Sequence, residues 1–217
     1  MPEAAGTPAA HVRGSRGPDA MPGERLSAVF FLFAVAAFFW SAGLVAFGVI
    51  AFHLTAAVHV PVSAVPLVYA AAMGAAALGA LASGYAYDRA GGAVLLVLPL
   101  LVTLIPLLAF SAGMGPVLAG VLVWGAATGI QDSTVKALVA DLVAPAKQGT
   151  AYGIFAAFEG AGALAGGALY GALYSSRPVL LAAVAALQTV AMALLIATAG
   201  RSHRRSATES RPAPELE

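Results

Sequence analysis

The feature that most constrains this chain is a long stretch without charge: no ionisable side chain occurs between Ala90 and Gln131. A helix needs about 20 mostly apolar residues to cross a bilayer, because the hydrocarbon layer is about 30 Å thick and a helix rises about 1.5 Å per residue. The stretch is twice that long, so it must reverse direction. Residues 111–116 supply the turn with two glycines and Pro116, which predicts two spans, at about 93–110 and 116–140.

The other uncharged runs are also long enough to cross the bilayer, so each predicts a membrane span. A second break, at residues 144–149 with Pro145 and Gly149, separates two further spans near the C-terminus. The fold class that follows is all-α: a polytopic membrane protein with six transmembrane helices. The expected spans cover residues 26–52, 62–87, 93–110, 116–140, 150–174 and 178–199.

The composition agrees with a bilayer as the solvent of this chain. Of its 217 residues, 60% are hydrophobic and 10% are charged, whereas soluble domains average about 45–50% and about 25%. The charges gather in the two tails rather than on a basic face, which excludes a nucleic-acid binder. The absence of Cys excludes disulfides, Cys-ligated zinc and thiol chemistry. Residues 1–25 and 201–217 are expected to be disordered tails of a bundle at 26–200, because neither can bury enough apolar area to fold.

The distribution of Lys and Arg predicts the orientation, because basic loops favour the cytoplasmic side of a membrane. With a cytoplasmic N-terminus, all of the 11 basic residues except Arg177 lie on or near that side. We therefore expect a multi-pass protein of the cell membrane with both termini in the cytoplasm. The first span is too long for a signal peptide, so we expect it to be retained.

Two segments of the chain resemble each other. Residues 79–87 and 167–174 both contain Gly-Ala-Leu, then a Gly with a Tyr three residues later, and a Val-Leu-Leu run follows each. The segments belong to the second and fifth spans, which run in opposite directions, as a 3+3 inverted repeat requires. Chance similarity in a chain rich in Ala, Gly and Leu is the alternative.

The loop after the second span carries a pattern of small and charged residues, GYAYDRAGG at residues 84–92. It resembles the cytoplasmic loop signature of the major facilitator superfamily, Gly-x-x-x-Asp-Arg-x-Gly followed by two basic residues. Gly84, Asp88, Arg89 and Gly91 match the signature, while glycine and alanine replace its two basic residues. Residues 129–153 also resemble the segment between the tenth and eleventh helices of bacterial members. The resemblance covers about residues 25–200 and is to the C-terminal six-helix half of such a transporter.

The resemblance implies half of a major facilitator fold, in which this loop locks or releases one conformation of the transport cycle. Physical reasons support the same positions. Gly84 allows close helix contact, Gly91 and Gly92 allow a tight turn with positive φ, and Asp88 can accept hydrogen bonds from a neighbouring helix N-terminus. The alternative is that Asp88 and Arg89 merely end a helix in solvent.

Three ionisable residues lie inside the predicted spans. Glu159 is nine residues into the fifth span, and Asp132 and Lys136 are four residues apart on one face of the fourth, where they can pair. A charge inside a membrane costs at least about 2.5–3.5 kcal/mol, so such groups face a bundle interior or a wet cavity. Glu159 is the leading candidate for contact with protons or substrate, and Asp132 with Lys136 is the second. The alternative is that the charges only fix helix packing.

The fifth span also carries several glycines, of which Gly162 and Gly166 have Gly-x-x-x-Gly spacing. Small residues let helices approach closely in a membrane, so we expect these two to serve helix packing. His53 and His59 are expected in a solvated outer loop and make a poor metal site, so no metal or cofactor is expected. Four further side chains lie within spans, in directions that the sequence does not fix: Trp40, Trp124, Gln131 and Gln188.

These patterns favour a transporter over an enzyme. His-Glu-x-x-His, Gly-x-Ser-x-Gly and paired carboxylates on one helix are absent. The expected function is transport of a small solute by alternating access, with protons as a second candidate cargo. One six-helix bundle forms only one wall of such a pathway, so the expected partner is a second six-helix half, another copy or a separate chain. The alternative is an accessory or truncated membrane protein without transport activity of its own.

Overall fold

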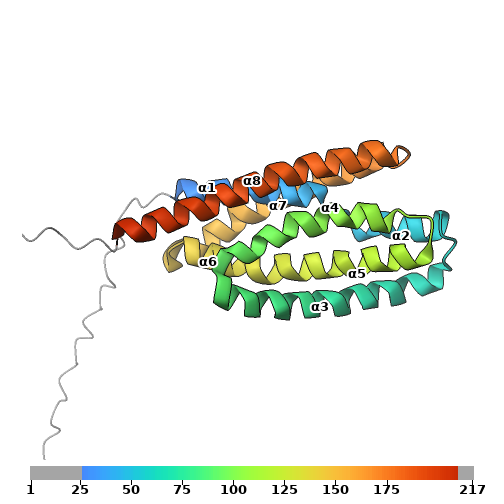
Figure 1. Ribbon diagram of the computed structural model, residues 1–217, viewed down its shortest axis with the longest axis horizontal. Coiled ribbons are helices and arrows are strands. Elements are labelled where there is room, and N and C mark those ends of the chain that lie inside the picture. The colour runs from blue at the N-terminus through green and yellow to red at the C-terminus, as the bar shows by residue number, and fades with distance from the viewer. Residues whose placement is uncertain (1–25, 210–217) are drawn as a thin grey trace, which may run out of the picture.

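The computed structural model describes the backbone of residues 26–209 and the side chains of residues 26–199, and every regular element in that part of the chain is helical. The bundle is elongated, and its helices run roughly along one axis (Figure 1). The α-helices are α1 (Ala28–Gly43), α2 (Phe47–Ala56), α3 (Val65–Ala90), α4 (Val97–Ala109), α5 (Met114–Ile130), α6 (Lys136–Leu142), α7 (Gln148–Leu173) and α8 (Arg177–Glu209). Three short 3-10 segments and one π-helical segment join them: η1 (Val62–Ala64), η2 (Gly91–Leu96), η4 (Pro145–Lys147) and the π segment η3 (Gln131–Val135).

Five helical stretches of the described residues are long and apolar enough to cross a membrane. One of them, Val62–Ala109, is 48 residues long and contains both α3 and α4. The chain reverses at η2, so that α3 and α4 run in opposite directions (Figure 1). The other four stretches are Ala28–Ala56, Met114–Leu142, Pro145–Leu173 and Arg177–Ala199.

Local chemistry explains several helix boundaries. The Ser27 side chain accepts a hydrogen bond from the Phe30 N–H at 3.2 Å and caps the start of α1. Pro66 lies in the first turn of α3, where its missing N–H costs nothing. At the other end of α3, Gly91 has a φ of +58°, a conformation that glycine adopts without strain. The turn expected at Gly91 therefore forms, and it starts the reversal toward α4.

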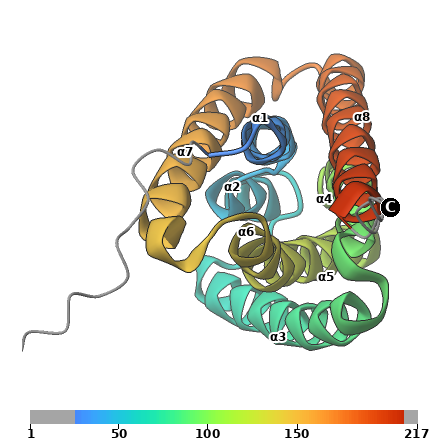
Figure 2. The same ribbon diagram turned by 90° about the vertical axis from the view of Figure 1, so that its left-hand side faces the viewer.

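α1 lies inside the bundle, with α7 and α8 beside it. α5 lies on the same side of α1 as α2 does (Figure 2). Its aromatic side chains Phe30, Phe33 and Trp40 are fully buried. The Phe33 ring stacks on Phe155 of α7, with ring centroids 5.3 Å apart. These contacts make α1 the central element of the core.

Glycines set the closest helix contacts. In α5, a Cβ atom at Gly125 or Gly129 would collide with the backbone carbonyl of Ala72 or Ala76 in α3. An added Cβ at Gly84, by contrast, would meet only the Ser133 hydroxyl at 3.8 Å, an ordinary van der Waals contact. The close approach of α3 to its neighbour thus occurs in the middle of the helix, two turns before Gly84.

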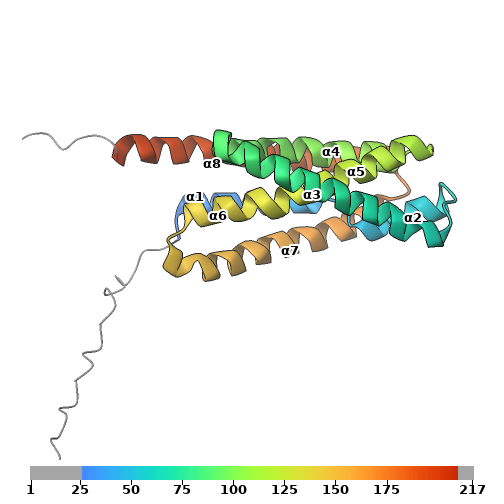
Figure 3. The same ribbon diagram turned by 90° about the horizontal axis from the view of Figure 1, so that it is seen from below.

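The two α7 glycines with Gly-x-x-x-Gly spacing pack against the backbone of α1. A Cβ atom at Gly162 would collide with the Phe38 carbonyl oxygen, and one at Gly166 would collide with that of Ala42. Backbone-to-backbone contact of this kind is how small residues bring helices together in a membrane. α7 otherwise lies at the edge of the bundle (Figure 3).

The structure differs from the sequence expectation in the first span. Residues 26–52 were expected to form one helix, but the helix is interrupted at residues 44–46, where Leu44 and Ala46 have extended ψ angles of 111° and 138°. At the C-terminus, α8 continues past the expected end of the bundle at residue 200 to Glu209. Of the expected tails at 1–25 and 201–217, residues 1–25 and 210–217 lie outside the described residues.

Candidate functional site

The centre of the candidate site is a hydrogen bond between two membrane-spanning elements. The Gln131 Nε2 atom, at the start of the π segment, donates to Glu159 Oε1 of α7. The Glu159 side chain is half-buried between these elements. The sequence singled out Glu159 but left the direction of Gln131 open, and the structure brings the two together.

The π segment itself shapes this region. A π turn inserts one extra residue into a helix and is frequently found at functional sites. Here it separates α5 from α6 and carries Gln131, Asp132 and Thr134. The Gln131 Oε1 and Thr134 Oγ1 atoms are buried and have no hydrogen-bond partner among the described residues. Buried polar atoms usually have a partner, so these two atoms are exceptions to the rule.

Asp132 and Lys136 face each other across one helical turn. The Lys136 Nζ atom lies 3.9 Å from Asp132 Oδ1, and both side chains are 67% exposed. An exposed ion pair contributes only about 0–1 kcal/mol to stability. The pair therefore adds little to helix packing, and its charges stay accessible beside Glu159. We call Gln131, Asp132, Lys136 and Glu159 the charged wall.

Tyrosine hydroxyls connect the helices around the charged wall at one end of the bundle. The Tyr152 hydroxyl of α7 donates to the Lys136 carbonyl oxygen at 2.9 Å. The Tyr87 hydroxyl of α3 donates to Asp141 Oδ2 of α6 at 2.6 Å. These bonds join α6 to both α3 and α7, so the charged wall is held from both sides.

The loop signature lies at the same end of α3. The Arg89 guanidinium stacks over the Tyr85 ring at 3.4 Å and donates to the Tyr85 carbonyl oxygen at 3.2 Å. Asp88 is exposed, and within residues 26–199 its carboxylate has no hydrogen-bond or ion-pair partner. The bond expected between Asp88 and a helix N-terminus is not formed by this part of the chain. The Asp88 carboxylate is therefore open to a contact from outside the bundle.

The interruption of the first span is held by polar side chains of three other helices. The Trp124 indole N–H of α5 donates to the Val45 carbonyl oxygen at 2.8 Å, and the Tyr170 hydroxyl of α7 donates to that of Gly43 at 2.7 Å. Gln188 Nε2 of α8 donates to the Phe39 carbonyl oxygen at 3.3 Å. Where a helix ends inside a membrane, its carbonyls need such donors because water is excluded. This site was not predicted from the sequence. The signal that could have indicated it is the set of polar side chains within otherwise apolar spans, Trp124, Tyr170 and Gln188.

The expectation of a solvated His53 was wrong. His59 is exposed as expected, whereas His53 lies in α2 with 8% of its surface exposed. Its Nε2 atom lies 3.0 Å from the Ser111 carbonyl oxygen and its Nδ1 atom 3.0 Å from the Tyr174 hydroxyl. Because a carbonyl oxygen can only accept, Nε2 carries a proton, and in the neutral imidazole Nδ1 then accepts from Tyr174. Burial raises the pKa of the Tyr174 hydroxyl above its usual range, which keeps this donor protonated.

The chain is similar to known proteins over most of its length. The family model of the Major Facilitator Superfamily matches residues 29–217. Uncharacterized proteins of Mycobacterium bovis and Mycobacterium tuberculosis are 45% identical to the chain over 156 residues, which is 71% of the chain and 38% of each relative. The chain thus spans well under half the length of these relatives. No solved structure gives a significant match.

Proposed function

Because the chain belongs to the major facilitator superfamily, we propose that it forms one half of a secondary transporter, in which a small solute binds between two helical bundles that rock about it. Members of this superfamily are transporters rather than enzymes. The observation that carries the proposal is the charged wall, in which Gln131 holds Glu159 and the pair of Asp132 and Lys136 follows Gln131 along the same membrane-spanning stretch. Charged groups within membrane-spanning segments are rare, and they mark pathways for solutes or ions.

The proposed half crosses the membrane six times. The reversal at η2 divides the 48-residue stretch into two crossings, α3 and η2 with α4, each of about the length that a bilayer requires. Together with the four other stretches this gives six crossings, arranged as a 3+3 inverted repeat. An even number of crossings places both termini on one side, and the excess of basic residues assigns that side to the cytoplasm of a cell membrane.

The second wall of the pathway comes from another six-helix bundle that packs on α7. Five glycines of α7 have open space where a Cβ atom would stand. At 3.6 residues per turn they fall within about 40° of one another on the helix, on the face opposite Gly162 and Gly166. A line of small residues suits close contact with another helix. These five, the glycine stripe, are Gly149, Gly153, Gly160, Gly167 and Gly171.

The relatives support a partner bundle by their length. Each is more than twice as long as the matched part of this chain, so a second bundle has room in the same polypeptide. For this chain we propose a second six-helix half of the same kind as its partner. The exposed Asp88 carboxylate at the signature loop is available to contact it.

Within the pathway, Glu159 is the group that we assign to protons or substrate. Gln131 holds one of its carboxylate oxygens, and the charges of Asp132 and Lys136 lie on the adjacent π segment. Protonation of Glu159 would change the net charge of the charged wall from about −1 to neutral, which would alter its affinity for a charged solute.

Reconstitution separates the transporter from the alternative, an accessory or truncated protein. The chain is purified in mild detergent, its oligomeric state is measured, and uptake of a panel of solutes into proteoliposomes is followed with and without a pH gradient. A complex of two bundles that takes up solute supports the proposal. A strict monomer that takes up none supports the accessory protein instead.

A further inference from the structure

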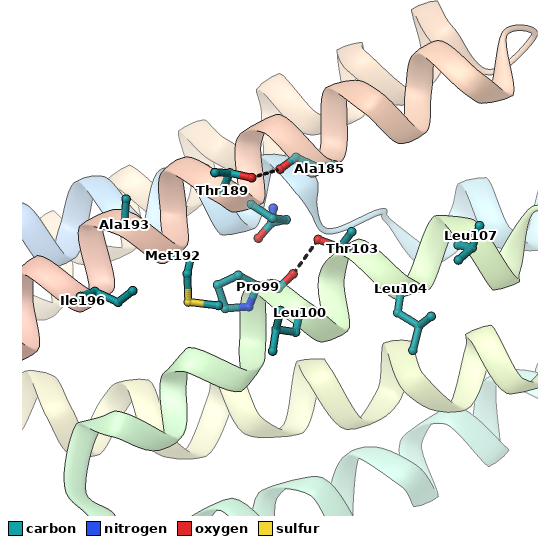
Figure 4. A pocket seen from close by; sticks show the side chains of 11 residues that line it. Pro99, Leu100, Thr103, Leu104, Leu107, Ala185, Thr189, Met192, Ala193 and Ile196 are labelled. Atoms are coloured by element: carbon teal, nitrogen blue, oxygen red, sulfur yellow. Dashed lines mark hydrogen bonds between the residues drawn. The ribbon is translucent and has the colours of Figure 1, made fainter.

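A groove of about 690 Å³ runs between α4 and α8, two helices that carry no residue of the charged wall (Figure 4). Its walls are mainly hydrocarbon. Thr103 and Thr189 line it as well, but each hydroxyl donates to a carbonyl of its own helix, to Pro99 and Ala185, both at 2.8 Å. The apolar side chains that line it include Leu100, Leu104, Leu107, Met192 and Ile196.

The floor of the groove is fixed. Gln188 lines it with 2% of its surface exposed, and its Nε2 atom is bonded to the Phe39 carbonyl oxygen of α1 at 3.3 Å. Pro99 and the neighbouring Leu98 and Val102 of α4 are buried below the exposed leucines. The floor of the groove is thus packed against the core, and the groove volume lies within the range of about 300–1,000 Å³ that is usual for small-ligand sites.

The length of the groove matches one leaflet of a bilayer. On α4 the lining residues run from Pro99 to Leu107, and on α8 from Ala185 to Ile196. At about 1.5 Å per residue these segments are about 12 and 16 Å long. One leaflet contributes about 15 Å of hydrocarbon, half of the total thickness. A fatty acyl chain that lies along the helices would fill the groove from end to end.

Positive charge follows the groove at one end. Beyond Ile196, the α8 backbone stays helical to Glu209. Arg201, Arg204 and Arg205 occur in this extension, about 8 to 14 Å further along the axis, and Glu209 is its single acidic residue. Juxtamembrane arginines attract anionic lipid headgroups.

We propose that the groove between α4 and α8 binds one acyl chain of an anionic phospholipid, whose negative headgroup is favoured by the basic sequence that follows the groove on α8. The acyl chain covers Leu100, Leu104 and Met192. The arginines favour a negatively charged headgroup, and the groove determines where on the protein the lipid binds. The lipid thereby occupies a defined site rather than exchanging freely like the rest of the lipid shell.

Native mass spectrometry of the full chain tests this proposal. The protein is mixed in detergent micelles with equal amounts of dioleoyl phosphatidylglycerol and dioleoyl phosphatidylcholine, which differ only in headgroup. We expect one phosphatidylglycerol to be retained at least about tenfold more than phosphatidylcholine under activation that strips other lipids. Equal retention of the two lipids would overturn the proposal.

Variants locate the site. Ala193→Trp places a large ring in the groove from an exposed position and is expected to abolish the retained lipid. Val190→Trp is the control, because Val190 is exposed on the same helix but does not line the groove. If Ala193→Trp does not fold, Leu104→Trp fills the groove from α4. Retention in a folded groove variant at the wild-type level would contradict the site.

The arginines are tested separately from the groove. A triple change of Arg201, Arg204 and Arg205 to Gln is expected to remove the preference for phosphatidylglycerol, so that both lipids bind alike. If the preference for phosphatidylglycerol is unchanged in this variant, other residues recognise the headgroup, and that part of the proposal is refuted. None of these measurements depends on transport activity.

Discussion

Gln131 and Glu159 are 28 residues apart in sequence, on either side of the hairpin between the π segment and α7, and the Gln131 amide donates a hydrogen bond to the Glu159 carboxylate. The bond joins the irregular part of one membrane-spanning helix to the half-buried carboxylate of the next. It makes Glu159 an oriented group instead of a mobile charge.

The first prediction concerns that carboxylate. Glu159→Gln keeps a side chain of the same shape that can still accept from Gln131, but it removes the charge and the titration. We expect the variant to fold and to lose the pH dependence of solute uptake, measured in proteoliposomes with an imposed pH gradient. Asp141→Asn is the matched control, because Asp141 also accepts from a side-chain donor but lies at the end of α6. Full uptake with unchanged pH dependence in Glu159→Gln would end the functional role of Glu159.

The second prediction uses two glycines of α7 that are two residues apart. In Gly162→Ala the new methyl group meets the Phe38 carbonyl oxygen, so we expect a loss of about 1–3 kcal/mol in the free energy of unfolding. Gly160→Ala places a methyl group in open space, and we expect it to leave stability unchanged or to raise it by up to about 1 kcal/mol. Titration with dodecyl sulfate in mixed micelles measures both. Equal effects at the two positions would contradict the packing of α7 on α1.

The third prediction concerns the interruption of the first span. Tyr170→Phe removes the donor to the Gly43 carbonyl oxygen and leaves that group unpaired in a buried place. We expect a loss of about 1 kcal/mol in the free energy of unfolding, since hydrogen bonds between membrane helices contribute about that much. Tyr85→Phe is the control, because the Tyr85 side chain is exposed. A Tyr170→Phe variant as stable as this control would show that the carbonyl does not depend on Tyr170.

The fourth prediction concerns the turn at the end of α3. Gly91 has a positive φ, so Gly91→Ala strains the backbone although nothing lies within 4 Å of the new Cβ atom. We expect it to lower the free energy of unfolding by about 1 kcal/mol. At Gly92 the φ is ordinary and the nearest atoms belong to the flexible Leu138 side chain, so Gly92→Ala should change stability less. The reverse order of the two variants would argue against this turn.

The sequence was sufficient to predict much of the helical framework. Uncharged runs, glycines and prolines located the helix ends near residues 90, 110, 144 and 174, because burial in lipid and turn chemistry are local properties. The pairing of Asp132 with Lys136 followed from their spacing on one helix. Residue type predicted a positive φ at Gly91 and Gly92 alike, and of the two only Gly91 adopts it.

The contacts between helices were not predictable in the same way. The spans are apolar on nearly every face, so periodicity does not reveal which side of a helix is buried. The bond from Gln131 to Glu159, the burial of His53 and the contact of Gly125 with α3 all depend on how neighbouring helices are rotated. The interruption at residues 44–46 has no proline, and its cause lies in donors such as Trp124 and Tyr170 on other helices.

The most direct test of the central claim is whether the charged wall opens to both sides of the membrane. The chain has no Cys, so Ala156→Cys introduces a single thiol on an exposed position of α7, one turn before Glu159. We expect a membrane-impermeant maleimide to label it both in intact cells and in inside-out vesicles, while Val190→Cys on α8, whose thiol would face lipid, stays unlabelled from either side. Labelling of Ala156→Cys from one side alone, or from neither, would contradict an alternating-access pathway along this wall.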